Sequence, residues 1–149
     1  MRTLWALLLG GLALVGTVEA RLGETKEQVI KRYGQPIKEL VEPPFDRTLI
    51  CLSGGFQLTF FFFDGFAEVM MVKKDNLNEE EVKTFLSKNS NGEGFKEVAD
   101  EYGQKVFSEK DRLGIWSKPQ NQLTIMTGSG FTRAEKTRQN EIKEKTKDF

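Results

Sequence analysis

The residue types that most often carry enzyme chemistry are scarce in this sequence of 149 residues. It has no histidine and a single cysteine, Cys51. Without histidine, the chain lacks the commonest general base, the Ser-His and Cys-His nucleophile pairs, and most zinc sites. The sequence also has no glycine-rich phosphate loop, EF-hand loop or Gly-x-Ser-x-Gly elbow. We therefore expect a protein that is not an enzyme and that has no cofactor and no metal.

The remaining reactive groups favour structural roles. Glu68 lies among aromatic residues, and a carboxylate at the solvent edge is a better interpretation of it than a catalytic one. A hydrolase that uses carboxylates alone would need two acidic side chains facing each other across a cleft, and it is the function that we favour least. Cys51 is expected in the core as an inert thiol. Gly128-Ser129-Gly130 is expected to be a linker and not a nucleophile turn.

The candidate functional residues are instead large apolar side chains on one face of a predicted sheet. They are Phe61, Phe63, Phe66 and Met70, with Trp116 joining from later in the chain. An exposed apolar patch of this kind marks a binding site for a partner or a ligand. The last helix or the second half of the chain can also cover these residues, and that interpretation is favoured. The leading functional hypothesis is binding of an extracytoplasmic protein, and the alternative is a small apolar ligand held in a closed concavity.

The face assignment rests on two predicted hairpin turns, Gly54-Gly55 and Asp64-Gly65. Asp-Gly between apolar runs is typical of a type I′ turn, in which both central residues have positive φ. The resulting register places Phe61 opposite Glu68 and Phe60 opposite Val69. The predicted core face is Leu49, Cys51, Leu58, Phe60, Phe62, Ala67, Val69 and Met71. The predicted second face is Ile50, Leu52, Gln57, Thr59, Phe61, Phe63, Phe66, Glu68, Met70 and Val72.

The elements that hold these residues have clear start signals. Thr25 and Gln28 form a capping box, which predicts a short helix that ends at Gly34. Asn78 predicts a second helix, and a capping box at Thr132 predicts a third, very polar one. The predicted strands are 37–41, 48–52, 56–63, 66–73, 95–98, 105–108, 112–116 and 123–126.

Two units of the chain follow the same plan, a capped helix and then about four antiparallel strands. This order predicts an α+β fold in which short helices pack on an antiparallel sheet. We expect one α+β domain over 21–128, with pseudo-repeat units 21–75 and 76–128. Residues 129–149 are expected to form a charged C-terminal helix or tail, and a solvated helix or tail is favoured over a helix that docks or forms a coiled coil.

The first helix segment also carries a resemblance. Leu22-Gly23-Glu24-Thr25-Lys26-Glu27-Gln28-Val29, followed by Tyr33-Gly34-Gln35-Pro36, resembles the G-x-T-x-x-x-V…G-x-P opening of the β-lactamase-inhibitor-like group. That group includes the SmpA/OmlA outer-membrane assembly lipoproteins, and small exported bacterial proteins have a similar opening. The resemblance implies a helix packed on an antiparallel sheet, in one or two copies, that binds other proteins. This chain lacks the lipidated N-terminal cysteine of the assembly lipoproteins.

The N-terminus indicates where the protein works. Residues 1–20 have a basic start, an apolar stretch over 4–15, and small or compact residues at the cleavage positions Val18 and Ala20, as in a secretory signal peptide. We expect cleavage before Arg21 and a periplasmic or secreted protein without a membrane span. The formal net charge of +0 argues against nucleic acid as the main partner.

Overall fold

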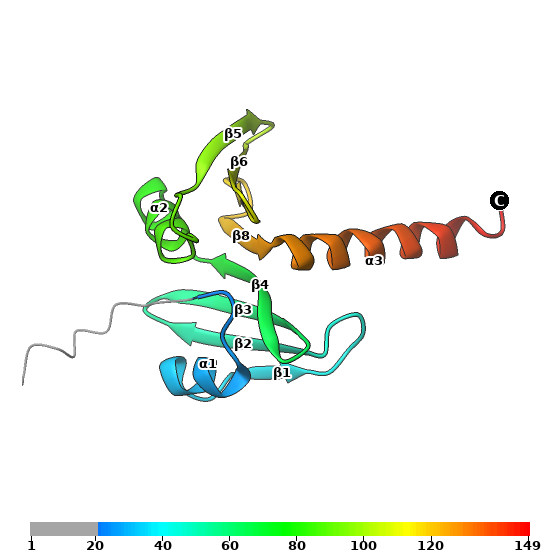
Figure 1. Cartoon of the computed structure of the whole chain (residues 1–149), viewed down its shortest axis with the longest axis horizontal. Helices are drawn as coiled ribbons and strands as arrows, with labels where there is room; N and C mark the ends of the chain where they lie inside the picture. The colour runs from blue at the N-terminus through cyan, green and yellow to red at the C-terminus, as the bar shows by residue number, and fades with distance from the viewer. Residues whose placement is uncertain (1–20) are drawn as a thin grey trace, which may run out of the picture.

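An eight-stranded antiparallel sheet organises residues 21–149, which are the residues that the computed structural model describes (Figure 1). The predicted signal peptide lies outside these residues. The helices are α1 (Lys26–Tyr33), α2 (Glu79–Lys88) and α3 (Gly128–Thr146). The strands are β1 (Lys38–Leu40), β2 (Arg47–Ser53), β3 (Phe56–Phe63), β4 (Phe66–Lys73), β5 (Lys96–Glu101), β6 (Gln104–Glu109), β7 (Arg112–Ser117) and β8 (Gln122–Thr127). The predicted α+β fold is confirmed.

The strand order is β1-β2-β3-β4-β8-β7-β6-β5. Helices α1 and α2 therefore each precede four adjacent strands, and the two groups meet where β4, the last strand of the first group, pairs with β8, the last strand of the second. That central ladder runs from Val69 opposite Met126 to Lys73 opposite Gln122. The sheet is thus continuous across both halves of the chain.

The two short helices begin where the sequence predicts. The Thr25 side chain accepts a hydrogen bond from the Gln28 backbone N–H, and the Gln28 side chain accepts one from the Thr25 N–H. Asn78 and Glu81 form the same reciprocal pair at the start of α2. Such capping boxes satisfy backbone N–H groups that have no partner inside the helix.

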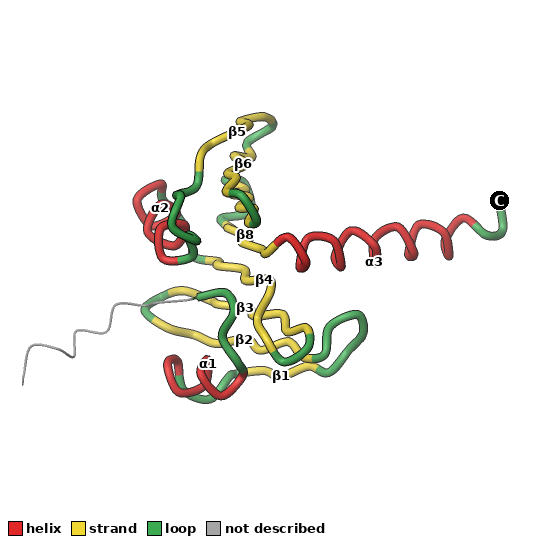
Figure 2. Tube along the Cα trace, viewed as in Figure 1, coloured by secondary structure: helices red, strands yellow, loops and turns green. Residues whose placement is uncertain are grey.

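Both short helices pack on the same face of the sheet, which we call the helix-bearing face. Their apolar side chains share one core with side chains from β2, β3, β4, β6, β7 and β8. The helix residues of this core are Val29, Val82, Phe85 and Leu86, with Ile30 and Tyr33 packed against it. In Figures 1 and 2, α3 leaves the sheet on the side opposite to α2.

A β-bulge in the β3–β4 hairpin overturns part of the predicted register. Phe62 pairs with Ala67 as expected, but Phe61 pairs with Val69, so Glu68 is an extra residue. The predicted pairs of Phe61 with Glu68 and of Phe60 with Val69 are therefore wrong. Because side chains alternate along a strand, one extra residue exchanges the faces of everything beyond it.

The bulge consequently moves four side chains to the faces opposite to those predicted. Met70 and Val72 belong to the core of the helix-bearing face and have no exposed surface. Val69 and Met71 lie on the other face. The β2–β3 hairpin is as predicted, with Cys51 opposite Leu58 and Leu49 opposite Phe60.

Helix α3 begins five positions earlier than predicted. Thr127, and not Thr132, is its N-cap and accepts a hydrogen bond from the Gly130 N–H at 3.0 Å. Gly128-Ser129-Gly130 is therefore the first helical turn and not a linker. Gly130 lies against the β4 backbone, where an added Cβ would be 2.6 Å from the Glu68 carbonyl oxygen.

Candidate interaction surface

The face of the sheet opposite α1 and α2, which we call the open face, contains three of the predicted functional residues, Phe61, Phe63 and Phe66. Phe63 is buried there at 1% exposure, and Phe61 is half-buried beside it. Phe45, from the loop before β2, packs against both rings, with centroid distances of 4.6 Å to Phe61 and 4.8 Å to Phe63. These three aromatic rings form a cluster at one end of the open face.

The start of α3 covers this aromatic cluster. The Arg133 guanidinium lies 4.7 Å from the centroid of the Phe63 ring. It also makes an ion pair of 2.7 Å with Asp64 in the β3–β4 turn and a longer contact of 3.9 Å with Glu68. Glu68 thus faces an arginine at the rim of the sheet, and its visible role is to hold α3 in place.

The other two predicted residues lie on the opposite face. Met70 and Trp116 are buried in the core of the helix-bearing face, with exposures of 0% and 5%. Phe66 lies on the open face opposite Phe63, outside the aromatic cluster, and is 50% exposed at the start of β4. The structure therefore brings Phe61 and Phe63 together but places Met70 and Trp116 on the opposite face. The bulge explains why Met70 was predicted on the wrong face. Trp116 was predicted on the wrong face because the sequence does not show which face of the second half continues the open face.

A row of six side chains crosses the open face. The sequence prediction placed two of them, Ile50 and Thr59, on this face without ranking them, placed Met71 in the core, and did not assign the other three to this face. Each member is the direct cross-strand partner of the next, on β2, β3, β4, β8, β7 and β6 in turn. We call this the middle row: Ile50, Thr59, Met71, Thr124, Ile115 and Val106. All six are half-buried. With neighbouring strands about 4.8 Å apart, the row spans about 24 Å.

Two further rows flank the middle row. On the side of α3 the row is more apolar and contains Thr48, Phe61, Val69, Met126 and Leu113. On the other side is the polar row, which is polar except for the exposed Leu52 on β2 and contains Leu52, Gln57, Lys73, Gln122, Ser117 and Gln104. The middle row has no charged side chain although 30% of the chain is charged. The open face thus changes from apolar beside α3 to polar on the far side of the middle row.

The reactive groups do not assemble on the open face. Cys51 is fully buried on the helix-bearing face, and burial raises the pKa of its thiol. In the described part of the chain, no group of three or more histidine, cysteine, aspartate and glutamate side chains is placed to hold a metal ion.

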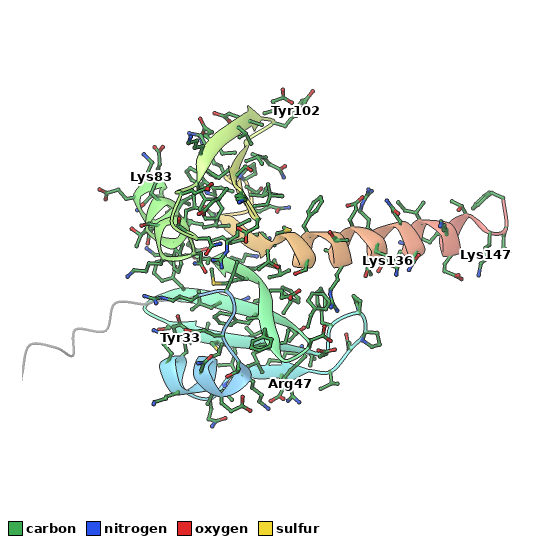
Figure 3. The ribbon with its side chains drawn as sticks, in the orientation of Figure 1. Tyr33, Arg47, Lys83, Tyr102, Lys136 and Lys147 are labelled. Carbon is green, nitrogen blue, oxygen red and sulfur yellow. The ribbon has the colours of Figure 1, made fainter. Side chains whose placement is uncertain are left out.

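No helix between residues 21 and 149 is both long enough and apolar enough to cross a membrane. The longest helix, α3, is mostly exposed, and Lys136 and Lys147 lie on the part of it that stands clear of the sheet (Figure 3).

Comparisons with known proteins identify no family for this chain. No family model matches the chain, and no curated protein matches it. Among solved structures, the chain is similar to a cysteine-rich secretory protein (SAV1118) from Staphylococcus aureus subsp. aureus Mu50, with a TM-score of 0.47 and 8% sequence identity. The match covers 72% of this chain and 45% of that protein, so the chain spans less than half of its length. The resemblance of the segment 22–36 to the β-lactamase-inhibitor-like group stays a hypothesis.

Proposed function

We propose that this protein is an exported, non-enzymatic interaction module of the cell envelope that binds another protein through its open face. The observation that carries the proposal is the middle row, whose six side chains are uncharged and half-buried, so that part of each one remains exposed. The periplasmic or secreted location is part of the proposal and rests on the sequence of residues 1–20.

The geometry of the middle row favours a protein partner over a small molecule. A row about 24 Å long matches the width of a standard interface patch, which buries about 800 Å² on each partner. The open face is built on six hydrogen-bonded strands, so its side chains are fixed before binding. A rigid surface loses little conformational entropy when a partner docks.

One end of the proposed interface is already occupied. Arg133 and Phe45 cover Phe63 from two sides, as described above, so the partner is expected to contact the middle row and the polar row. The exposed edge of Phe61 marks the boundary. This arrangement predicts that contact extends over β3, β4, β8 and β7, away from α3.

Site-specific photo-crosslinking tests the proposal. A photoreactive phenylalanine analogue replaces Thr59 or Thr124 in the middle row, and Thr84, which is exposed on α2, serves as the matched control. After export in the native cells, we expect a discrete crosslinked protein from the two middle-row positions and not from Thr84. The same adduct from all three positions, or from Thr84 alone, would contradict the proposed surface.

A further inference from the structure

A concave site lies on the helix-bearing face of the sheet, between α2 and the β5–β6 hairpin. It is a groove of about 740 Å³. Its volume falls within the range of small-molecule sites, roughly 300–1,000 Å³. The side chains that define its chemistry are Leu86, Phe95 and Phe107, with Lys105, Glu93 and Glu97.

The groove exists because α2 is packed toward the middle of the sheet. A glycine at position 114 of β7 lets the Leu86 side chain approach closely, since an added Cβ there would be 2.7 Å from a Leu86 methyl carbon. The β5–β6 hairpin extends beyond the helix, and every residue of β5 is exposed. Figure 1 shows the hairpin turning away from α2, and the exposed Tyr102 marks its far tip in Figure 3.

The floor of the groove is apolar and rigid. Leu86 and Phe107 are part of the main core and are 4% and 8% exposed. Phe95, which precedes β5, packs against the same core and is half-buried. An apolar group that enters the groove would therefore contact side chains that are already fixed by packing.

The charged side chains around the groove leave one carboxylate in excess. Lys105 lies 3.3 Å from Glu97 and 3.8 Å from Glu79, and its hydrogen bond to Glu97 raises its pKa. Lys83 lies 3.5 Å from Glu79, so both lysines of the lining already face carboxylates. Among the described residues, the Glu93 carboxylate has no ion-pair partner.

Glu93 is held at the mouth of the groove by its own backbone. Its N–H donates to the buried Glu109 carboxylate at 3.2 Å, and the Asn91 N–H donates to the same oxygen at 2.7 Å. Gly92, between them, has φ of 102° and gives the loop its tight path. The loop thus fixes the backbone from which the exposed Glu93 side chain extends.

We propose that this groove binds an amphipathic cation, with its apolar body on Leu86, Phe95 and Phe107 and its single positive charge beside Glu93. The shared chemistry is an amine or guanidinium next to an apolar group, supplied by a free amine or by a lysine or arginine side chain of a peptide. This site is separate from the open face, and the inference does not depend on the proposed function.

Calorimetric titration of the protein purified after export tests the inference with three probes. Phenylbutylamine has the apolar body and the positive charge, phenylbutyrate has the same body with a negative charge, and butylamine lacks the ring. We expect phenylbutylamine to bind about threefold to fivefold more tightly than phenylbutyrate, the range of an exposed ion pair. Butylamine should bind most weakly.

Two variants and a control locate the site. Glu93→Gln is expected to abolish the preference for the amine, whereas Phe95→Ser should weaken both phenyl probes. Glu101→Gln, on the exposed end of β5, should change neither. Tripeptides with a central lysine or glutamate between two phenylalanines separate the two sources, because tighter binding of the lysine peptide than of phenylbutylamine identifies a peptide ligand. Equal affinity for amine and carboxylate, no binding at millimolar concentration, or an unchanged preference in Glu93→Gln would each overturn the inference.

Discussion

At the scale of single residues, the structure assigns the polar and reactive side chains to holding the fold together. Asn89 is the clearest case, because it is 1% exposed and joins distant parts of the chain. Its side-chain oxygen accepts from the Leu22 N–H at 2.8 Å, and its amide donates to the Phe85 carbonyl at 2.8 Å. The start of the described chain is thereby fixed to the end of α2.

Cys51 gives a testable pH dependence at this scale. Burial raises the pKa of its thiol in the folded protein, so folding favours the neutral form. The resulting stability is fully present below the unfolded-state pKa of about 8.5 and is lost as the pH rises above it. We expect the free energy of unfolding to fall between pH 8 and pH 10, and a smaller fall in Cys51→Ala.

Alkylation kinetics check the same assignment. Iodoacetamide should modify native Cys51 at least about a hundredfold more slowly than the urea-unfolded chain, because reaction requires an opened state. Equal rates in the two states would show that the thiol is accessible, and the account of its pKa would then be wrong.

At the scale of elements, the sequence predicted the features that depend on contacts between residues close together in the chain. The caps of α1 and α2 are formed between residues three positions apart, so the sequence alone identified Thr25 and Asn78. The predicted start of α3 was wrong because both Thr127 and Thr132 are residues that can cap a helix. The contact of Gly130 with the β4 backbone, across more than 60 positions of sequence, selects the earlier one.

Two glycines in the first turn of α3 provide a matched test of that contact. An alanine at Gly130 would clash with the Glu68 carbonyl oxygen, whereas one at Gly128 would meet only the Asp111 carbonyl oxygen at 3.6 Å. We expect Gly130→Ala to lower the free energy of unfolding by about 1–3 kcal/mol. Gly128→Ala should be neutral or slightly stabilising, because alanine favours helix over glycine by about 1 kcal/mol.

Urea denaturation of the two variants measures this difference, and hydrogen exchange reports on α3 itself. In Gly130→Ala, amides of α3 should exchange faster than in the parent protein, since the helix would be displaced from β4. Equal stabilities of the two variants would mean that the contact between α3 and β4 does not determine where the helix starts.

At the scale of the whole molecule, the pairing of β4 with β8 decides which side chains share a face. The sequence predicted all eight strands and the helix-plus-four-strand plan, because each depends on local patterns. It could not predict this central pairing or the bulge at Glu68. The pairing joins strands from distant parts of the chain, and the bulge departs from the regular register that the Asp64-Gly65 turn predicts. For these reasons Trp116 and Met70 were placed on the wrong face and Thr124 and Ile115 were not ranked.

The central ladder should also make the two halves unfold together. Leu123 on β8 is fully buried and lies opposite Val72 of β4, at the junction of the halves. We expect Leu123→Ala to destabilise the protein by about 2–5 kcal/mol and to increase hydrogen exchange in both α1 and β6. Increased exchange confined to the second half would show that the halves are independent folding units.

The binding of the partner identified by crosslinking tests the central claim most directly. Its dissociation constant is measured for the parent protein, for Thr124→Arg in the middle row, and for Thr84→Arg on the exposed side of α2, after melting curves confirm that all three are folded. The open-face account predicts at least about tenfold weaker binding for Thr124→Arg, the loss of an interface contact worth more than about 1 kcal/mol, and unchanged binding for Thr84→Arg. Unchanged affinity of Thr124→Arg would contradict it.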